Sequence, residues 1–220
     1  MLEVRLFNPG LVENSLTAEH CVHACFQMLL RTRPGYQVFS FKKLDELMHK
    51  VPGKYTFEYN LVAEMPSLGF ATEIIWEFDL FRLSNDPKEF FLDIYGKPIG
   101  EITIANSDLE LLKLDAKRLY ESTQVKITTR SATFEDIKLK ILEGYYILCT
   151  INQRVLQADS GYVAHTILVY GFNDRGLIIH NPGPPSNDSA EIPWDLFNKA
   201  WACPDDKSRN IMAFKYNGNK

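Results

Sequence analysis

Cys21 is the residue of this sequence best placed to act as a nucleophile. It opens a segment in which Val22, Cys25 and Leu29 recur at intervals of three and four residues, the spacing of one helix face. A proline and glycine pair then ends the pattern. Residues 14–31 therefore predict a loop that leads into the N-terminus of a helix carrying a thiol. A thiolate is the nucleophile of cysteine-dependent acyl transfer.

The place of Cys21 at the helix start predicts an activated thiol. Thr17 is the expected N-cap, because its hydroxyl can accept a backbone N–H of the first turn. Cys21 then lies within about one turn of the positive end of the helix dipole, where the thiol pKa falls below its free value of about 8.5. Cys25 lies on the core-facing side of the same helix and is the weaker candidate.

His165 is the best candidate for the base that accepts the thiol proton. Residues 163–170 are rich in β-branched and aromatic side chains, residues 173–176 carry turn residues, and residues 177–180 resume as a strand. This pattern predicts a β-hairpin. If the turn centres near residues 173 and 174, His165 lies opposite Asn181 within a residue or two. A side-chain amide beside an imidazole fixes its tautomer and orientation.

Each of these residues also has a purely structural interpretation. Cys21 alone could be a buried helix cysteine, and His165 alone could be a hydrogen-bonded strand histidine. Asn181 could serve only to open the turn at Pro182. His180 is a weaker candidate than His165, because alternation along a strand points it to the opposite face from its neighbour Asn181.

The order of cysteine, histidine and asparagine resembles that of the papain-like cysteine peptidase superfamily. Within it, the chain most resembles the branch of the bacteriocin-leader (double-glycine) peptidases and their stand-alone relatives. HCVHACFQMLL resembles their DCGxACLxMIL, HTILVYGFNDRGLIIHNPG resembles their H-x-x-x-V-x-G-Y/F-D…D/N-P, and IPWDLFNKAW resembles their closing segment. The likeness covers most of the chain apart from about residues 77–131.

This resemblance implies an α+β fold in one papain-like domain over residues 1–220. An N-terminal helical lobe of about residues 1–76 would carry the cysteine helix. It would pack on an antiparallel sheet lobe of residues 132–220 that carries the histidine and asparagine. Residues 77–131 would be an insertion or a set of covering helices.

The resemblance also implies acyl transfer by a triad of Cys21, His165 and Asn181. Water as acceptor makes a peptidase or amide hydrolase, and an amine or thiol acceptor makes an acyltransferase. Where the family has its oxyanion-hole glutamine, this chain has Ser15, so Ser15 or its neighbour Asn14 is the candidate donor. Losing one such donor costs on the order of a hundredfold in rate. The alternative is therefore a papain-like fold kept as a binding or regulatory module.

Zinc binding at the cysteine helix is a further alternative. His20, Cys21, His23 and Cys25 are all possible ligands. However, positions 20 and 23 lie roughly 100° or more around the helix from one cysteine or the other, and no second ligand pair completes the set. We therefore expect no metal and no cofactor.

Composition limits the class of partner. The chain has 220 residues, 45% of them hydrophobic, and 24 basic against 28 acidic residues give a net charge of −4. We expect a peptide or a small amide or thioester as substrate, and neither nucleic acid nor a membrane as partner. The four cysteines form no disulfide framework, and no apolar run has signal-peptide length. A soluble, reduced, cytoplasmic protein is the expectation, and the oligomeric state is not predicted.

The same patterns predict the other elements. Ser40 and Thr133 are expected N-caps. Helices are expected at residues 41–51, 59–68, 106–120, 134–142 and 194–201, with a short helix beginning within residues 85–89. Strands are expected at residues 2–7, 71–76, 126–129, 145–151 and 211–216.

Overall fold

The computed structural model describes residues 3–218 and has an α+β fold. Its strands are β1 (Glu3–Arg5), β2 (Phe70–Trp76), β3 (Val125–Thr129), β4 (Tyr146–Asn152), β5 (Ala164–Asn173), β6 (Gly176–Asn181), β7 (Asn187–Pro193) and β8 (Ile211–Tyr216). Its α-helices are α1 (Cys21–Leu30), α2 (Phe41–Leu47), α3 (Tyr59–Glu64), α4 (Leu80–Asn85), α5 (Pro87–Ala105), α6 (Leu109–Tyr120), α7 (Phe134–Leu142), α8 (Gln153–Leu156) and α9 (Trp194–Trp201). Leu2, the first residue of the predicted N-terminal strand, lies outside the described residues.

The strands of residues 3–218 form one eight-stranded sheet in the order β3-β2-β8-β4-β5-β6-β7, with β1 paired to β5. Neighbouring strands are antiparallel except β2 and β3, which are parallel. The predicted hairpin is confirmed: β5 and β6 pair around a short turn, with Leu168 opposite His180. Strand β5, which carries His165, lies beside the middle strand β4, and β6, which carries Asn181, lies beside the edge strand β7.

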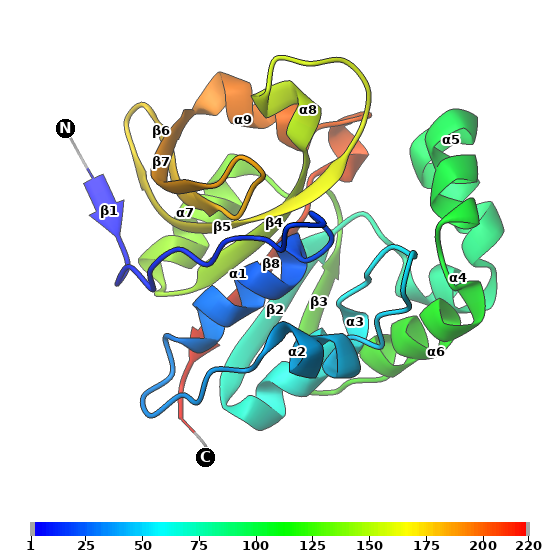
Figure 1. Ribbon diagram of the computed structural model, residues 1–220, viewed down its shortest axis with the longest axis horizontal. Helices are drawn as coiled ribbons and strands as arrows, with labels where there is room; N and C mark the ends of the chain where they lie inside the picture. Colours follow the sequence, from blue (N-terminus) through cyan, green and yellow to red (C-terminus); the bar gives the residue numbers. More distant parts are fainter. Residues whose placement is uncertain (1–2, 219–220) are drawn as a thin grey trace.

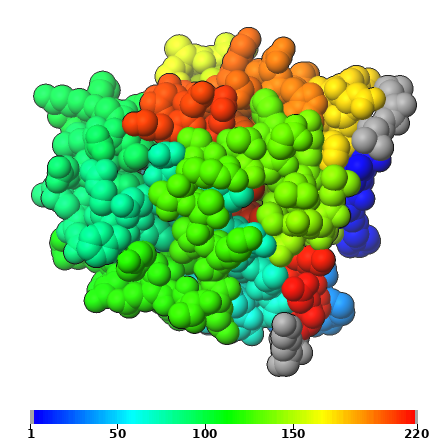
Figure 2. Space-filling model, turned by 180° about the vertical axis from the view of Figure 1, so that it is seen from behind, coloured from blue at the N-terminus to red at the C-terminus, as the bar shows by residue number. Residues whose placement is uncertain are grey.

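Helices cover both faces of this sheet, because its central strands are apolar on both sides. In β4, Leu148 belongs to one core cluster, whereas its neighbours Ile147 and Cys149 belong to the other. The Leu148 cluster includes most of α1, which crosses the front of the sheet in Figure 1. The Ile147 cluster includes α7 and α9, whose yellow-green and orange residues form part of the rear surface in Figure 2.

Helix α1 is buried along nearly its whole length. Each of its residues from Val22 to Leu30 is buried, and Cys21 at its N-terminus is the exception. Such a helix is held by packing on every side rather than along one amphipathic stripe. The apolar spacing predicts the helix but not its burial on every side, which comes from the elements packed around it.

The middle of the chain, residues 77–131, supplies three helices and one strand. Helices α4, α5 and α6 gather at one side of the molecule in Figure 1, and β3 then joins the edge of the sheet beside β2. Helix α5 is interrupted at Gly96, where a φ of +69° is compatible with glycine but not with helix continuation. This segment therefore extends the sheet as well as covering it.

Several local predictions are confirmed, and others are wrong. Ser40 and Thr133 cap α2 and α7, and α9 and β8 have the expected bounds. Strand β7 was not predicted from the sequence, and its residues are mostly polar. It is an edge strand paired only with β6, so its side chains need not be apolar.

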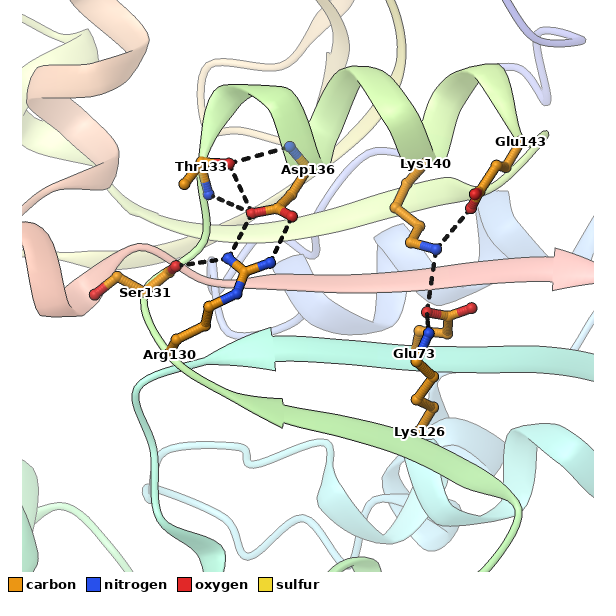
Figure 3. Close-up of polar contacts among 8 residues, drawn as sticks. All are labelled: Glu73, Lys126, Arg130, Ser131, Thr133, Asp136, Lys140 and Glu143. Carbon is orange, nitrogen blue, oxygen red and sulfur yellow. Dashed lines mark hydrogen bonds and ion pairs between the residues drawn. The ribbon is translucent and has the colours of Figure 1, made fainter.

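Asp136 holds the start of α7 in place. Its carboxylate forms a capping box with Thr133 and accepts two hydrogen bonds of 2.7 Å from the guanidinium of Arg130 (Figure 3). The Arg130 contact, together with the Thr133 bonds, lowers the pKa of Asp136 from 3.8 to about 2. In the same view, Lys140 lies between Glu73 and Glu143 and joins α7 to β2.

Replacing Asp136 by asparagine will destabilise the protein near neutral pH. A carboxylate with a lowered pKa stabilises the fold above its unfolded pKa, and that stabilisation is lost as the pH falls from about 4 towards 2. Because Arg130 is about half exposed, we expect a loss of only about 1 to 2 kcal/mol after allowance for screening. Urea unfolding at pH 7 and pH 3 measures both effects.

Glu135→Gln, on the same turn, is the matched control. Its side chain is 81% exposed and pairs with the partly exposed Lys138 of the same helix, so a change below about 0.5 kcal/mol is expected. An Asp136→Asn protein as stable as wild type at pH 7 would contradict the prediction.

Candidate functional site

Asn14 organises the start of α1. Its Oδ1 accepts the backbone N–H of His20 at 2.7 Å and that of Ser15 at 2.8 Å. The helix begins at Cys21, with His20 in the N-cap position and no side-chain cap of its own. The prediction that Thr17 caps this helix is therefore wrong: the Thr17 hydroxyl bonds Ser15 instead. Asn14, six residues before the N-cap residue His20, orders the turn into the helix instead of Thr17.

The loop before Cys21 is also tied to the loop after Asn181. Asn14 donates its backbone N–H to the carbonyl of Pro182 at 2.9 Å and its side-chain amide to the carbonyl of Gly183 at 2.8 Å. The candidate cysteine and the candidate asparagine, 160 residues apart in sequence, are thus brought into one region of the molecule.

Cys21 lies close to strand β5 at Thr166, the residue that follows the candidate base His165. The backbone and the side chain of Thr166 lie near enough to the Cys21 thiol to lower its pKa in part. One turn further along α1, the Cys25 thiol donates to the carbonyl of the same Thr166 at 3.3 Å. These contacts fix the start of the cysteine helix on the strand that carries His165.

The expectation of a lowered Cys21 pKa is wrong for the resting protein. Burial raises the pKa of the thiol above its ordinary value, and the hydrogen bonds from Thr166 and Val22 offset this only in part. The helix-start position does supply the Val22 bond, but desolvation of the charged form is the larger effect. Cys21 therefore rests as a thiol rather than as a thiolate.

His165 and Asn181 form the predicted pair. His165 Nε2 lies 2.8 Å from Asn181 Oδ1, and the imidazole is 3% exposed. The backbone N–H of Gly183 donates to the same oxygen at 2.9 Å, which identifies that atom as the amide carbonyl. His165 Nε2 must then carry the proton and donate it to Asn181. Its Nδ1 is left as the proton acceptor, and burial lowers the pKa of the ring, so it is neutral at pH 7.

His180 is separate from this pair, as alternation along the strand predicts. Its Nε2 bonds Asn8, its ring stacks on Tyr170, and its Nδ1 contacts Asp188 at 3.0 Å. The side chain is fully buried. His180 is therefore a structural histidine of the sheet.

The two candidate oxyanion donors have other partners. The Ser15 hydroxyl bonds His20 Nδ1 at 2.7 Å and Thr17 at 2.9 Å. The Asn14 amide donates to Gly183. Either side chain would have to exchange a bond within the protein for one to a substrate.

Glu58 is a candidate site residue that sequence analysis missed. It lies at the start of α3, is 9% exposed, and its charge would raise the pKa of both Cys21 and Cys25. Burial raises the pKa of its carboxyl from 4.5 to about 7. Nothing in its local sequence separates it from a surface glutamate, because the burial comes from elements distant in the chain.

Comparisons with known proteins identify no family. No family model matches the sequence, and no curated protein matches it. Among solved structures, a Bacillus anthracis protein described as a "putative C39-like peptidase" aligns over 100% of both chains, with 13% sequence identity and a TM-score of 0.47. Within residues 3–218, no helix has both the length and the apolar character needed to span a bilayer.

The tautomer of His165 is directly measurable. Nitrogen-15 NMR at pH 7.5 will show His165 protonated at Nε2, because Asn181 Oδ1 accepts that proton. In Asn181→Ala this preference will weaken and the pKa of the ring will fall further, since the Asn181 bond favours the charged form. A ring protonated at Nδ1 in the wild type would contradict the assignment of Nδ1 as the acceptor.

Glu58→Gln will stabilise the protein above pH 7. A carboxyl group with a raised pKa favours the fold below its unfolded pKa of 4.5, and that contribution is lost as the pH rises through about 7. Glu58→Gln should therefore raise the free energy of unfolding by up to about 2 to 3 kcal/mol more at pH 8 than at pH 5. Thermal unfolding at the two pH values measures this.

Glu46→Gln is the control for Glu58→Gln. Glu46 is more than half exposed and pairs with the exposed Lys43, so its replacement should change stability by under about 0.5 kcal/mol at either pH. Equal effects of Glu58→Gln at pH 5 and pH 8 would show that this carboxyl group is not buried as described.

Proposed function

We propose that this protein is a cysteine-dependent acyl-transfer enzyme, most simply a peptidase or amide hydrolase. Cys21 would be the nucleophile, His165 the general base and Asn181 the residue that orients the base. The bond from His165 Nε2 to Asn181 Oδ1 carries this proposal. It leaves Nδ1 as an acceptor on strand β5, which the partly buried N-terminal end of α1 approaches at Thr166.

The proposed reaction starts from two neutral groups. His165 Nδ1 takes the Cys21 proton as the sulfur attacks the substrate carbonyl, so the charge forms only during the reaction. The imidazolium then gives this proton to the leaving amine, and an acyl-enzyme remains. Water, activated by the same Nδ1, would release the acid and restore the thiol.

The backbone N–H of Cys21 would be one donor to the developing oxyanion, with Ser15 or Asn14 as the second. Both side chains are bonded within the protein, so a substrate would have to displace one of those bonds. The serine hydroxyl can rotate away from Thr17 without a change in the backbone. Ser15 is therefore the more accessible of the two donors.

The papain-like sequence pattern supports the same assignment, and its bacteriocin-leader branch would make a peptide the substrate. Amine or thiol acceptors would give an acyltransferase on the same triad. Hydrolysis is the simpler proposal, because it requires no second binding site.

A binding or regulatory module is the second candidate function. Two observations favour it: burial raises the pKa of the Cys21 thiol, and both expected oxyanion donors are already paired. A module of this kind would retain the His165 and Asn181 pair as part of its structure. In such a module, replacing His165 would not change the reactivity of Cys21.

The decisive measurement is alkylation of each cysteine by iodoacetamide between pH 5 and pH 9, resolved by mass spectrometry. In an enzyme, Cys21 will react at pH 7 faster than its raised thiol pKa alone would allow. His165→Ala should slow this reaction by about a hundredfold, the lower end of the usual contribution of a general base. A screen of fluorogenic peptide amides would follow.

Cys203 and Cys25 are controls within the same protein. Cys203 is partly exposed and Cys25 is fully buried, so His165→Ala should leave the reactivity of both unchanged. His180→Gln is the matched histidine variant and should leave Cys21 unaffected. If Cys21 reacts equally in wild type and His165→Ala, the enzyme proposal fails and the binding module is favoured.

A further inference from the structure

A cluster outside the proposed triad joins α1 to α2. His20 and His23, one turn apart at the start of α1, face Asp45 of α2. Asp45 Oδ1 lies 2.9 Å from His23 Nε2 and 3.3 Å from His20 Nε2. One nitrogen from each ring and one carboxylate oxygen thus lie within 4.8 Å of one another.

These atoms converge without forming hydrogen bonds. His23 is fully buried, and neither of its ring nitrogens has a hydrogen-bond partner within residues 3–218. Asp45 Oδ1 is buried and has no such partner either, although His23 Nε2 is close enough. Buried polar atoms without partners are rare and costly. A ligand between the three atoms would supply a partner for His23 Nε2 and Asp45 Oδ1, though not for His23 Nδ1.

Two other histidines have hydrogen-bond partners at both ring nitrogens, unlike His23. His49 uses both ring nitrogens, one toward Asp115 at 2.8 Å and the other toward Asn60 at 3.3 Å. His180 likewise has a partner at each nitrogen. His23 alone among these three is buried with neither nitrogen hydrogen-bonded.

The surroundings prepare His20 to act as a ligand. Its Nδ1 is 2.7 Å from the Ser15 hydroxyl, which leaves Nε2 directed toward Asp45. Metal-bound histidines usually have such a partner on the second nitrogen. The ring also stacks on Phe41 of α2, with centroids 5.1 Å apart and planes 1° apart. His20 is thus fixed in position and orientation.

We propose that His20 Nε2, His23 Nε2 and the Asp45 carboxylate bind a divalent first-row transition metal, with zinc as the best match. Imidazole and carboxylate are ordinary zinc ligands. Two ligands of a tetrahedral zinc ion lie roughly 3.3 Å apart for bonds of about 2.0 Å, close to the 3.3 Å and 2.9 Å found here. The side chains of His20 and Asp45 are 16% and 34% exposed, so a fourth position is open to solvent.

The local charge sets the affinity. The carboxylate of Asp45 favours a cation, and the nearby Lys50 ammonium opposes one but is paired with Glu19 at 3.6 Å. Cys21 and Cys25 are not in this ligand set, in contrast to the set considered from sequence.

The test is a titration of tag-free, metal-stripped protein with Zn²⁺ by calorimetry, and with Co²⁺ by visible absorption. We expect one metal per chain. Asp45→Asn and His23→Gln should each weaken binding by about 100-fold or more, and Ser15→Ala by about 10- to 100-fold. His49→Gln, a histidine of another His–Asp pair, and Cys21→Ser should bind as wild type.

Three results would overturn the proposal: no binding by the wild type at micromolar protein, wild-type affinity in Asp45→Asn, or loss of binding in Cys21→Ser. Circular dichroism establishes that each variant is folded. If His23→Gln does not fold, Asp45→Asn and Ser15→Ala still decide the outcome, because both replace partly exposed side chains. The readout is metal binding, so it is independent of whether Cys21 and His165 form an enzyme.

Discussion

The hydrogen bonds of Asn14 are the constraint on which the candidate site depends. One side chain accepts the N–H groups that shape the turn into α1 and donates to the loop that follows Asn181. Its backbone N–H adds a second bond to that loop. Asn14 thus holds Cys21 in position together with the packing of α1 and the contacts of its first turn with Thr166 of β5. The chain thus joins its two candidate catalytic segments through an amide that does not itself take part in proton transfer.

Burial then determines the charge state of this region. Cys21, His165 and Glu58 are all shifted by desolvation toward their neutral forms. A site built in this way holds no ion pair at rest, and any charge must form together with a bound substrate. The raised pKa of a thiol is therefore compatible with catalysis through a neutral base, and it is equally a property of a buried structural cysteine. The dependence of Cys21 reactivity on His165 separates the two.

Much of the fold and part of the site follow from short-range sequence patterns. The helix spacing after Cys21, the hairpin that pairs His165 with Asn181 and the caps at Ser40 and Thr133 each depend on residues close together in the chain. Local patterns of this kind reflect backbone geometry directly, which is why they can be recognised in one sequence.

The features that were missed depend on contacts between distant segments. Asp45 and Glu58 lie in ordinary polar contexts, and their roles come from tertiary structure. Asp45 contacts His23 of α1, and Glu58 is buried and close enough to Cys21 to raise the pKa of its thiol. The cap at Asn14 was missed because it lies six residues before His20 rather than at the expected N-cap. The helix dipole was expected to lower the pKa of Cys21, but burial raises it. Desolvation depends on what covers the thiol, which a local sequence pattern does not show.

The complete burial of α1 beyond Cys21 has a consequence for the motions of the protein. Amide hydrogens inside such a helix exchange with solvent only when the whole core opens, whereas those of the exposed residues 16–19 exchange through local fluctuations. Cys21 therefore lies at the boundary between the slowest and the fastest exchanging parts of the chain. Its sulfur is held by the slowly exchanging helix α1, whereas access to it depends on the local fluctuations of residues 16–19.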